Sequence, residues 1–147
     1  MDAETLARTC ADIMWADDRA AQALGMVLRE VGPGRAVVEM RVAPHMVNGH
    51  DTCHGGYIFT LADTAFAYGC NSRNDRAVAS HCSVTFVAPA REGMVLVASC
   101  EERQRFGRSG VYDVAVCDES GRAIAEFRGL SRTIRGTFVP PEEVAGA

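Results

Sequence analysis

Hydrophobic residues near the amino terminus recur at intervals of three, four or seven positions, which is the period of an amphipathic helix. The pattern runs from about Glu4 to Leu24 and places along one face Leu6, Cys10, Ile13, Met14 and Ala21. The sequence therefore predicts an N-terminal helix over about residues 4–24.

After this helix the period changes to two, which is typical of strands with one buried face. Hydrophobic residues at 38, 40 and 42 alternate with charged Glu39 and Arg41, and a shorter strand is expected before them over residues 26–31. Further strands are predicted over residues 78–87, 94–102, 110–117 and 122–134, separated by turns that read AREG, QRFGRSG and DESG. Since connections this short join antiparallel neighbours, we expect an antiparallel sheet.

A second helix is predicted to begin near Gly56, and unlike the first it is hydrophobic on every side. A helix with this pattern is buried. Because both elements must bury a face, the pattern predicts an α+β fold in which the antiparallel sheet wraps around this central hydrophobic helix. No repeat or linker interrupts the chain, so we expect one domain over residues 1–147, with a frayed tail after about residue 136.

Composition and charge narrow the classes of partner. The formal net charge of −4 supplies no basic field, so neither nucleic acid nor an anionic membrane is expected as a partner. The first residues do not form a signal peptide, and no run approaches the ~18 hydrophobic residues of a membrane span, which favours a cytoplasmic location. The six cysteines are scattered without C-x-x-C spacing, so we expect reduced, mostly buried thiols and no metal site.

One acidic residue, Asp63, lies within the hydrophobic helix, where burial would favour its protonated form. One interpretation is a structural carboxylate that is hydrogen-bonded inside the fold. The other is catalytic, because His54-Gly55-Gly56 precede the helix, and glycines allow the unpaired amides of a first turn to approach a carbonyl oxygen.

A carbonyl-polarising amide and a carboxylate that acts as base or nucleophile are the minimum requirement for acyl hydrolysis. Eight residues separate Gly55 from Asp63, which corresponds to roughly 12 Å along a helix at ~1.5 Å per residue. The two groups of one chain cannot readily act on one carbonyl. If both act on the same substrate, the site must therefore form between two subunits.

The motifs around this helix read NGH at residues 48–50, HGG at 54–56 and LADTAFA at 61–67, followed by AVAS at 77–80, GVYD at 110–113 and FRG at 127–129. Together they closely resemble the signature of hotdog-fold acyl-CoA thioesterases of the phenylacetic-acid-degradation (PaaI) type. The resemblance spans most of the chain from about Asn48 to Gly136, and it implies a hotdog fold and a homotetramer of dimers with active sites between subunits.

The resemblance also implies roles for single residues. Asp63 matches the catalytic carboxylate and Gly55 the backbone donor to the thioester carbonyl. Asn48 matches the residue that positions the nucleophilic water, and His54 the residue that shapes the oxyanion end. Further substrate contacts are expected from Gly56, Thr64 and Ser80. No cofactor is expected, since coenzyme A is part of the substrate.

Other candidate residues have simpler interpretations. Most arginines are expected to be solvated, but three adjoin the helix end or a strand turn and are expected to contact coenzyme A phosphates: Arg73, Arg76 and Arg108. The aromatic residues 15, 57, 59 and 66 are more typical of a core than of an acyl pocket. Cys53 beside His54 suggests a thiol nucleophile, although adjacent residues of an extended loop point apart.

The leading hypothesis is the hydrolysis of an aryl-acetyl or hydroxyphenylacetyl-CoA to the free acid and coenzyme A. Two alternatives stay open. One is a thioesterase for a broad range of medium-chain or aromatic acyl-CoA outside phenylacetate metabolism, and the other is a non-catalytic acyl-CoA-binding module of the same fold. A hydratase of this fold would carry a G-x-D-x-N-P-x-H segment, which the sequence lacks.

Overall fold

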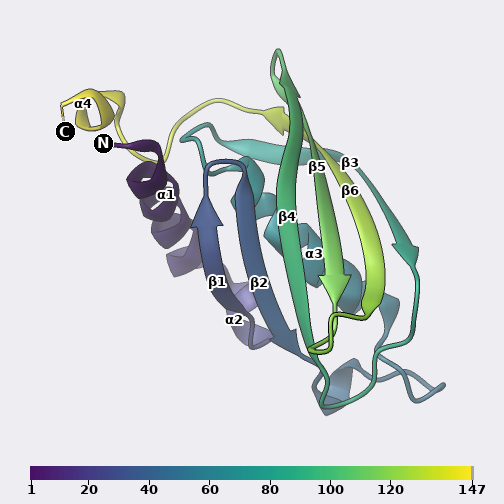
Figure 1. Ribbon diagram of the computed structural model, residues 1–147. Helices are drawn as coiled ribbons and strands as arrows, with labels where there is room; N and C mark the ends of the chain where they lie inside the picture. Colours follow the sequence, from purple (N-terminus) through teal and green to yellow (C-terminus); the bar gives the residue numbers. More distant parts are fainter. Residues whose placement is uncertain (147) are drawn as a thin grey trace.

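The computed structural model describes residues 1–146 and is built on a six-stranded antiparallel sheet. The strands are β1 (Val27–Gly32), β2 (Arg35–Arg41), β3 (Ala77–Phe86), β4 (Val95–Phe106), β5 (Ser109–Cys117) and β6 (Ala123–Thr133). Their order is β1-β2-β4-β5-β6-β3, so β1 and β3 form the two edges (Figure 1). Every strand expected from the alternating pattern is present.

One strand boundary differs from the prediction. β4 continues to Phe106, through residues that the sequence pattern assigned to a turn, and its register against β5 shifts between Glu102 and Gln104. The turn itself is confined to the two residues between β4 and β5, where Gly107 takes a positive φ of 57°. A glycine in the left-handed region allows the tight reversal.

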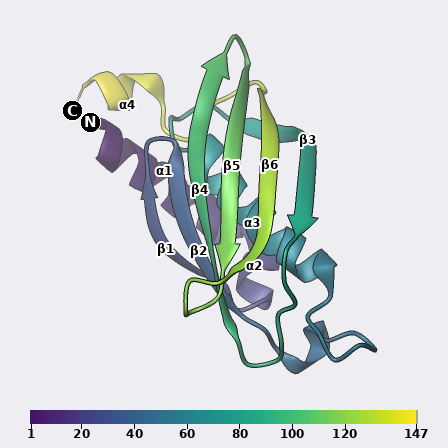
Figure 2. The same ribbon diagram turned by 45° about the vertical axis from the view of Figure 1, so that its right-hand side comes forward.

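The hydrophobic helix α3 (Gly55–Cys70) lies across one face of the sheet and contacts all six strands (Figures 1 and 2). Its buried residues are Ile58, Leu61, Ala62, Ala65, Phe66, Tyr68, Gly69 and Cys70. A short 3-10 helix (Pro44–Met46) and a loop lead into it from β2. The expected α+β arrangement, an antiparallel sheet around a central hydrophobic helix, is confirmed.

The N-terminal helix expected over residues 4–24 is two helices, α1 (Ala3–Asp17) and α2 (Arg19–Ala23). Asp18 separates them, because its backbone leaves the helical conformation and its side chain accepts a hydrogen bond from the Ala21 amide at 3.1 Å. The same carboxylate accepts a hydrogen bond from the Tyr68 hydroxyl of α3 at 3.0 Å. A contact with a residue fifty positions away therefore sets the break, and the local period does not reveal it.

The expectation of a frayed tail after residue 136 is wrong for the residues that the structure describes. The Asn74 side chain donates to the carbonyl of Val139 at 2.8 Å and accepts from the amides of Phe138 and Val139. A short helix, α4 (Pro141–Ala145), follows, and the terminal amine of Met1 donates to the carbonyl of Val144. In both ribbon views α4 lies beside the N-terminal end of α1 (Figures 1 and 2).

None of the helices within residues 1–146 is both long and hydrophobic enough to cross a membrane.

Phe66 packs α3 tightly against β5 and β6. Its ring lies 5.6 Å from that of Tyr112 and 5.8 Å from that of Phe127, measured between centroids. A Cβ added at Gly129 of β6 would stand 2.8 Å from three atoms of the Phe66 ring. Since neighbouring aromatic rings enclose Phe66, this ring has little room to move, and position 129 requires glycine.

We therefore expect Gly129→Ala to lower the free energy of unfolding by about 1–3 kcal/mol, the usual range for an overpacked core. Urea denaturation followed by circular dichroism measures the change. Gly49→Ala is the matched control, because no atom lies within 4 Å of the added methyl group and the backbone is not in the left-handed region. Equal effects of the two substitutions would contradict the close packing of Phe66 on β6.

Candidate active site

The start of α3 presents one unpaired backbone amide. His54 is the N-cap residue, and its Nδ1 accepts a hydrogen bond from the amide of Gly56 at 2.9 Å. Its carbonyl accepts from the amide of Tyr57 at 3.0 Å. Within residues 1–146 the amide of Gly55 makes no hydrogen bond, and it stands at the positive end of the helix dipole. Gly55 therefore provides the free amide donor. Gly56 was also expected to contact substrate, but its amide already donates to the N-cap side chain of His54.

Asp63 lies two turns further along α3 and is half-buried against β3. The thiol of Cys82 on β3 donates a weak hydrogen bond to Asp63 Oδ1, with 4.0 Å between sulfur and oxygen. Burial raises the pKa of Asp63 above its ordinary value, and no basic side chain of the described residues offsets this effect. A carboxylate with a raised pKa is a stronger base than an exposed one, which suits proton abstraction from water.

The thiols near the site are poor nucleophiles. Burial raises the pKa of Cys53, and burial followed by the charge of Asp63 raises the pKa of Cys82. For Cys70 the same two causes raise the pKa to about 12. All three are therefore held as neutral thiols near pH 7, which argues against the alternative of a Cys53 nucleophile.

The other polar candidate side chains are engaged in hydrogen bonds within the chain. Asn48 Oδ1 accepts from the amide of His50 at 2.9 Å and from the hydroxyl of Thr52 at 3.2 Å, which orders the loop before α3. The Thr64 hydroxyl donates to the carbonyl of Thr60 at 2.7 Å, and the Ser80 hydroxyl donates to the carbonyl of Leu130 at 3.1 Å. Thr64 is next to Asp63, and Ser80 is exposed on β3 two positions before Cys82.

The three candidate phosphate-binding arginines lie at the far end of α3 from Gly55. Arg73 donates to both carboxylate oxygens of Glu102 at 3.2 and 3.0 Å, so its charge is already paired. Arg76 stacks on the ring of Phe138, and Arg108 is exposed and donates to the carbonyl of Thr133. A helix of 16 residues is about 24 Å long. Within one chain, these arginines and Gly55 do not meet.

β3 is an edge strand, and its outer side is unpaired within residues 1–146. Hydrophobic side chains on and just after it are about half exposed: Val78 at 47%, Phe86 at 52% and Val87 at 54%. The beginning of α3 packs on the end of this strand, because a Cβ at Gly55 would stand 2.8 Å from Phe86 Cζ. The middle of α3 packs on the middle of the strand through Asp63 and Cys82. Long exposed edges of this kind are normally covered.

A hydrophobic recess of about 440 Å³ opens beside Gly55. It is lined by Thr52, Cys53, Gly55, Ile58, Phe86, Val87, Ala88 and Pro89. The residue that carries the unpaired amide thus borders a cavity with mostly hydrophobic walls, which is the usual character of a small-molecule site.

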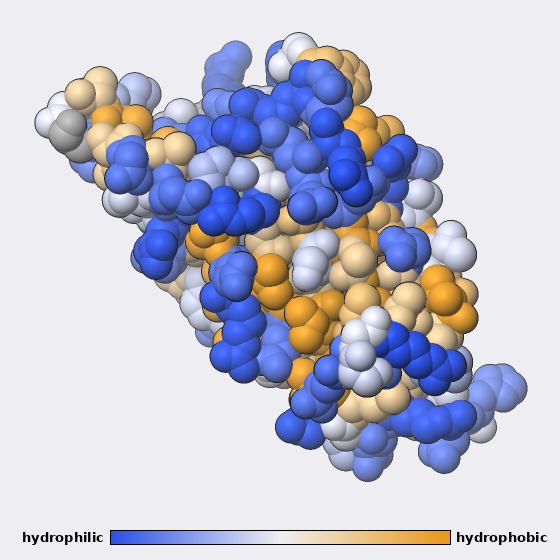
Figure 3. All heavy atoms as spheres, viewed as in Figure 1, coloured by the Kyte–Doolittle hydropathy of each residue, from blue (hydrophilic) through white to orange (hydrophobic). Residues whose placement is uncertain are grey.

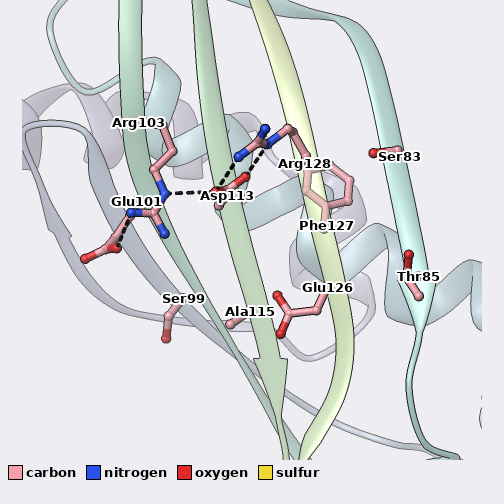
Figure 4. Close-up of a pocket in the computed structure, with 10 residues that line it drawn as sticks. All are labelled: Ser83, Thr85, Ser99, Glu101, Arg103, Asp113, Ala115, Glu126, Phe127 and Arg128. Atoms are coloured by element: carbon pink, nitrogen blue, oxygen red, sulfur yellow. Dashed lines mark hydrogen bonds and ion pairs between the residues drawn. The ribbon is translucent and has the colours of Figure 1, made fainter.

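A recess of about 450 Å³ lies on the opposite face of the sheet, which α3 does not cover (Figure 4). Its central carboxylate, Asp113, accepts hydrogen bonds from Arg128 at 2.6 Å and Arg103 at 2.8 Å, and these arginines hold the pKa of Asp113 below its usual value. Figure 3 shows this face with hydrophobic residues toward its middle and hydrophilic residues around them. None of the predicted site residues lies there, so the candidate active site is the α3–β3 side.

Among the residues that the structure describes, no group of three or more His, Cys, Asp or Glu side chains could hold a metal ion.

Comparison with known protein families matches residues 50–125 to the Thioesterase superfamily, a segment that contains Gly55, Asp63 and Phe86. The chain belongs to this superfamily. It is 44% identical to the acyl-coenzyme A thioesterase PaaI of Escherichia coli, with 87% of this chain and 91% of that protein covered.

Solved structures of relatives agree with this membership. The structure of the E. coli PaaI protein from the phenylacetic acid degradation operon matches with a TM-score of 0.91 at 42% identity, covering 92% of this chain and 99% of that one. A variant of the phenylacetic acid degradation protein PaaI from Thermus thermophilus matches with a TM-score of 0.77 at 34% identity, covering 80% and 100%. The predicted resemblance to PaaI-type thioesterases and the predicted hotdog fold are both confirmed.

Sequence reasoning missed Cys82 and Phe86 as neighbours of the candidate site. Nothing in the local sequence places the ring of Phe86 on Gly55. Its place on an edge strand could have indicated its exposure, but the strand order is a property of the folded chain.

Asp63→Asn is expected to raise the melting temperature at pH 7. The folded-state pKa of Asp63 lies above its unfolded value of 3.8, so the folded protein binds more protons between the two values and loses stability as the pH rises through that window. The difference between variant and wild type should therefore be largest at neutral pH and disappear toward pH 4 and below. Differential scanning calorimetry across this range measures it.

Asp51→Asn is the control for this experiment. Asp51 is exposed and has a positive φ of 63°, a conformation that asparagine adopts as readily as aspartate. If both substitutions changed the melting temperature with the same pH dependence, burial of Asp63 would not be the cause.

Proposed function

We propose that this protein is an acyl-CoA thioesterase that hydrolyses hydroxyphenylacetyl-CoA, or a similar aryl or medium-chain acyl-CoA, to the free acid and coenzyme A. The observation that carries the proposal is the pair of groups on α3: the unpaired Gly55 amide at its start and the half-buried Asp63 with a raised pKa. The 44% identity to a protein named as an acyl-coenzyme A thioesterase supports the same reaction.

In this mechanism the amide of Gly55 donates to the thioester carbonyl oxygen, and the bond strengthens as negative charge develops there. Asp63 either takes a proton from the attacking water or attacks the carbonyl carbon itself. In the first case a carbon–oxygen bond forms as the proton passes to Asp63, and the carbon–sulfur bond breaks to release coenzyme A as its thiolate. Asn48, whose Oδ1 is held by the loop, keeps its side-chain NH2 as a donor for water or substrate.

The active unit in this proposal is a homodimer. Gly55 and Asp63 of one chain are about 12 Å apart along α3, and the free edge of β3 can pair with the same edge of a second copy. Gly55 lies against Phe86 and Asp63 against Cys82, four residues earlier on the strand. Antiparallel pairing about Val84 would put Phe86 of one copy opposite Cys82 of the other, which brings each Gly55 toward the other copy's Asp63. Two such dimers would make the expected tetramer.

The same pairing gives the arginines a role. Antiparallel strands place the beginning of one β3 beside the end of the other, so Arg76 of one copy would lie near Gly55 of its partner. Arg76 and Arg108 are then the candidates for the coenzyme A phosphates, because Arg73 is paired with Glu102. A cytoplasmic location stays a prediction.

The reaction is tested by thiol release from a panel of acyl-CoA substrates, detected with a thiol dye. We expect turnover of aryl-acetyl and medium-chain acyl-CoA, and a loss in kcat on the order of 10²-fold or more for Asp63→Asn, which keeps the shape but cannot accept the proton. Tight binding without turnover across the panel would favour an acyl-CoA-binding module. Turnover that excludes all aryl groups would favour a thioesterase outside phenylacetate metabolism.

The shared site is tested by mixing two inactive variants, Asp63→Ala and Gly55→Val. The valine side chain would collide with the Phe86 ring, which is the reason for glycine at this position, since Gly55 does not have a positive φ. In a mixed dimer one site contains both substitutions and the other site contains neither. Activity should reappear on mixing, up to half of the sites in each heterodimer. Heterodimers that are verified by mass and remain inactive would place both groups in one chain.

A further inference from the structure

The hydrophobic recess is bordered by Gly55, the residue whose amide would bind the thioester. A carbonyl oxygen that accepts from the Gly55 amide fixes the first carbon of the acyl group at this point. Gly55 is itself part of the wall of the recess, together with buried Ile58 of α3 and the segment from Phe86 to Pro89. Its volume of about 440 Å³ exceeds what a single aromatic ring fills, so the walls rather than the volume must select the acyl group.

Phe86 is the only aromatic residue in this wall, and it touches Gly55 directly. A Cβ at position 55 would lie 2.8, 3.2 and 3.3 Å from Cζ, Cε1 and Cε2, so the far edge of the ring rests on the Gly55 α-carbon. More than half of the Phe86 surface is exposed. An exposed ring next to an unpaired amide offers an apolar, aromatic contact to whatever group the amide holds.

We propose that Phe86 is the specificity-determining residue for the acyl group, and that its ring favours aryl-acetyl over straight-chain acyl groups by direct contact. The proposal rests on the thioesterase function proposed above and adds the acyl subsite to it. Ring contacts between aromatic groups depend on geometry, whereas a flexible aliphatic chain can use the other hydrophobic walls. Phe86 thus affects the choice of substrate more than the chemistry at the carbonyl.

The first test compares phenylacetyl-CoA with octanoyl-CoA. Phe86→Leu keeps a large hydrophobic side chain on the strand edge but removes the ring. Phe86→Ala removes both the ring and the large side chain. For either variant kcat/KM with phenylacetyl-CoA should fall about 10-fold, mainly through KM, as expected for the loss of one buried aromatic contact. With octanoyl-CoA the change should stay within about 3-fold.

The control variant is Phe106→Ala, an equally exposed phenylalanine (54%) at the end of β4, outside the recess. It should leave the ratio between the two substrates unchanged. Equal losses on both substrates for the Phe86 variants would overturn the proposal, because a purely structural role would lower both activities together.

A second test uses the contact between the ring and Gly55. The Cβ of Gly55→Ala must push the Phe86 ring into the recess, so this substitution should lower kcat/KM for phenylacetyl-CoA by about 10-fold in the natural protein. In the Phe86→Ala background the methyl group has room, and the same substitution should cost less than about 3-fold. Neighbours in contact are expected to be non-additive in this way. Equal penalties in the two backgrounds would overturn the contact.

A binding measurement distinguishes failure of the acyl-subsite proposal from failure of the thioesterase proposal. Dissociation constants of the non-hydrolysable thioether analogues of the two substrates, measured by isothermal titration calorimetry, report the selectivity of binding without turnover. A wild-type protein that releases no thiol from either substrate contradicts the thioesterase proposal. The ratio of the two dissociation constants in wild type and in Phe86→Leu still decides whether the ring selects the acyl group.

Discussion

The burial of α3 is the constraint on which the rest of this structure depends. The helix is hydrophobic on all sides, so a single contact face cannot satisfy it, and it contacts all six strands of the sheet. Phe66 fixes its depth, because Gly129, Tyr112 and Phe127 surround the ring. With the depth and direction of α3 fixed, its start rests on the end of β3, and its middle rests on Cys82.

That burial also explains the chemistry of Asp63. A carboxylate on such a helix cannot be fully solvated, and its pKa rises because the surroundings are hydrophobic and no cation compensates. Only the weak donor Cys82 reaches it within the described residues. A half-buried carboxylate that lowers stability is more typical of function than of structure. Membership of the Thioesterase superfamily agrees with the catalytic interpretation.

The geometry of one helix leaves the proposed site incomplete in a single chain. Gly55 and Asp63 are held on the same rigid element, so no loop motion can bring them together. The exposed edge of β3 lies beside both groups and carries hydrophobic side chains at both of its ends. Covering this edge with a second copy would therefore pair its free backbone groups and complete the site in one step, which links assembly to activity in the proposed dimer.

The sequence alone determined the features that depend on local pattern. These are the six strands, which show a period of two, the hydrophobic helix, the short antiparallel connections, and the presence of HGG ahead of Asp63 on the same helix. The tertiary structure decided what depends on contacts between distant residues. Tyr68 reaches Asp18 and breaks the N-terminal helix, Asn74 holds the tail, Glu102 neutralises Arg73, and Phe86 meets Gly55. A periodic pattern records which side chains face the core but not which partner they meet there, because strand order and helix placement are set by the packing of the whole chain.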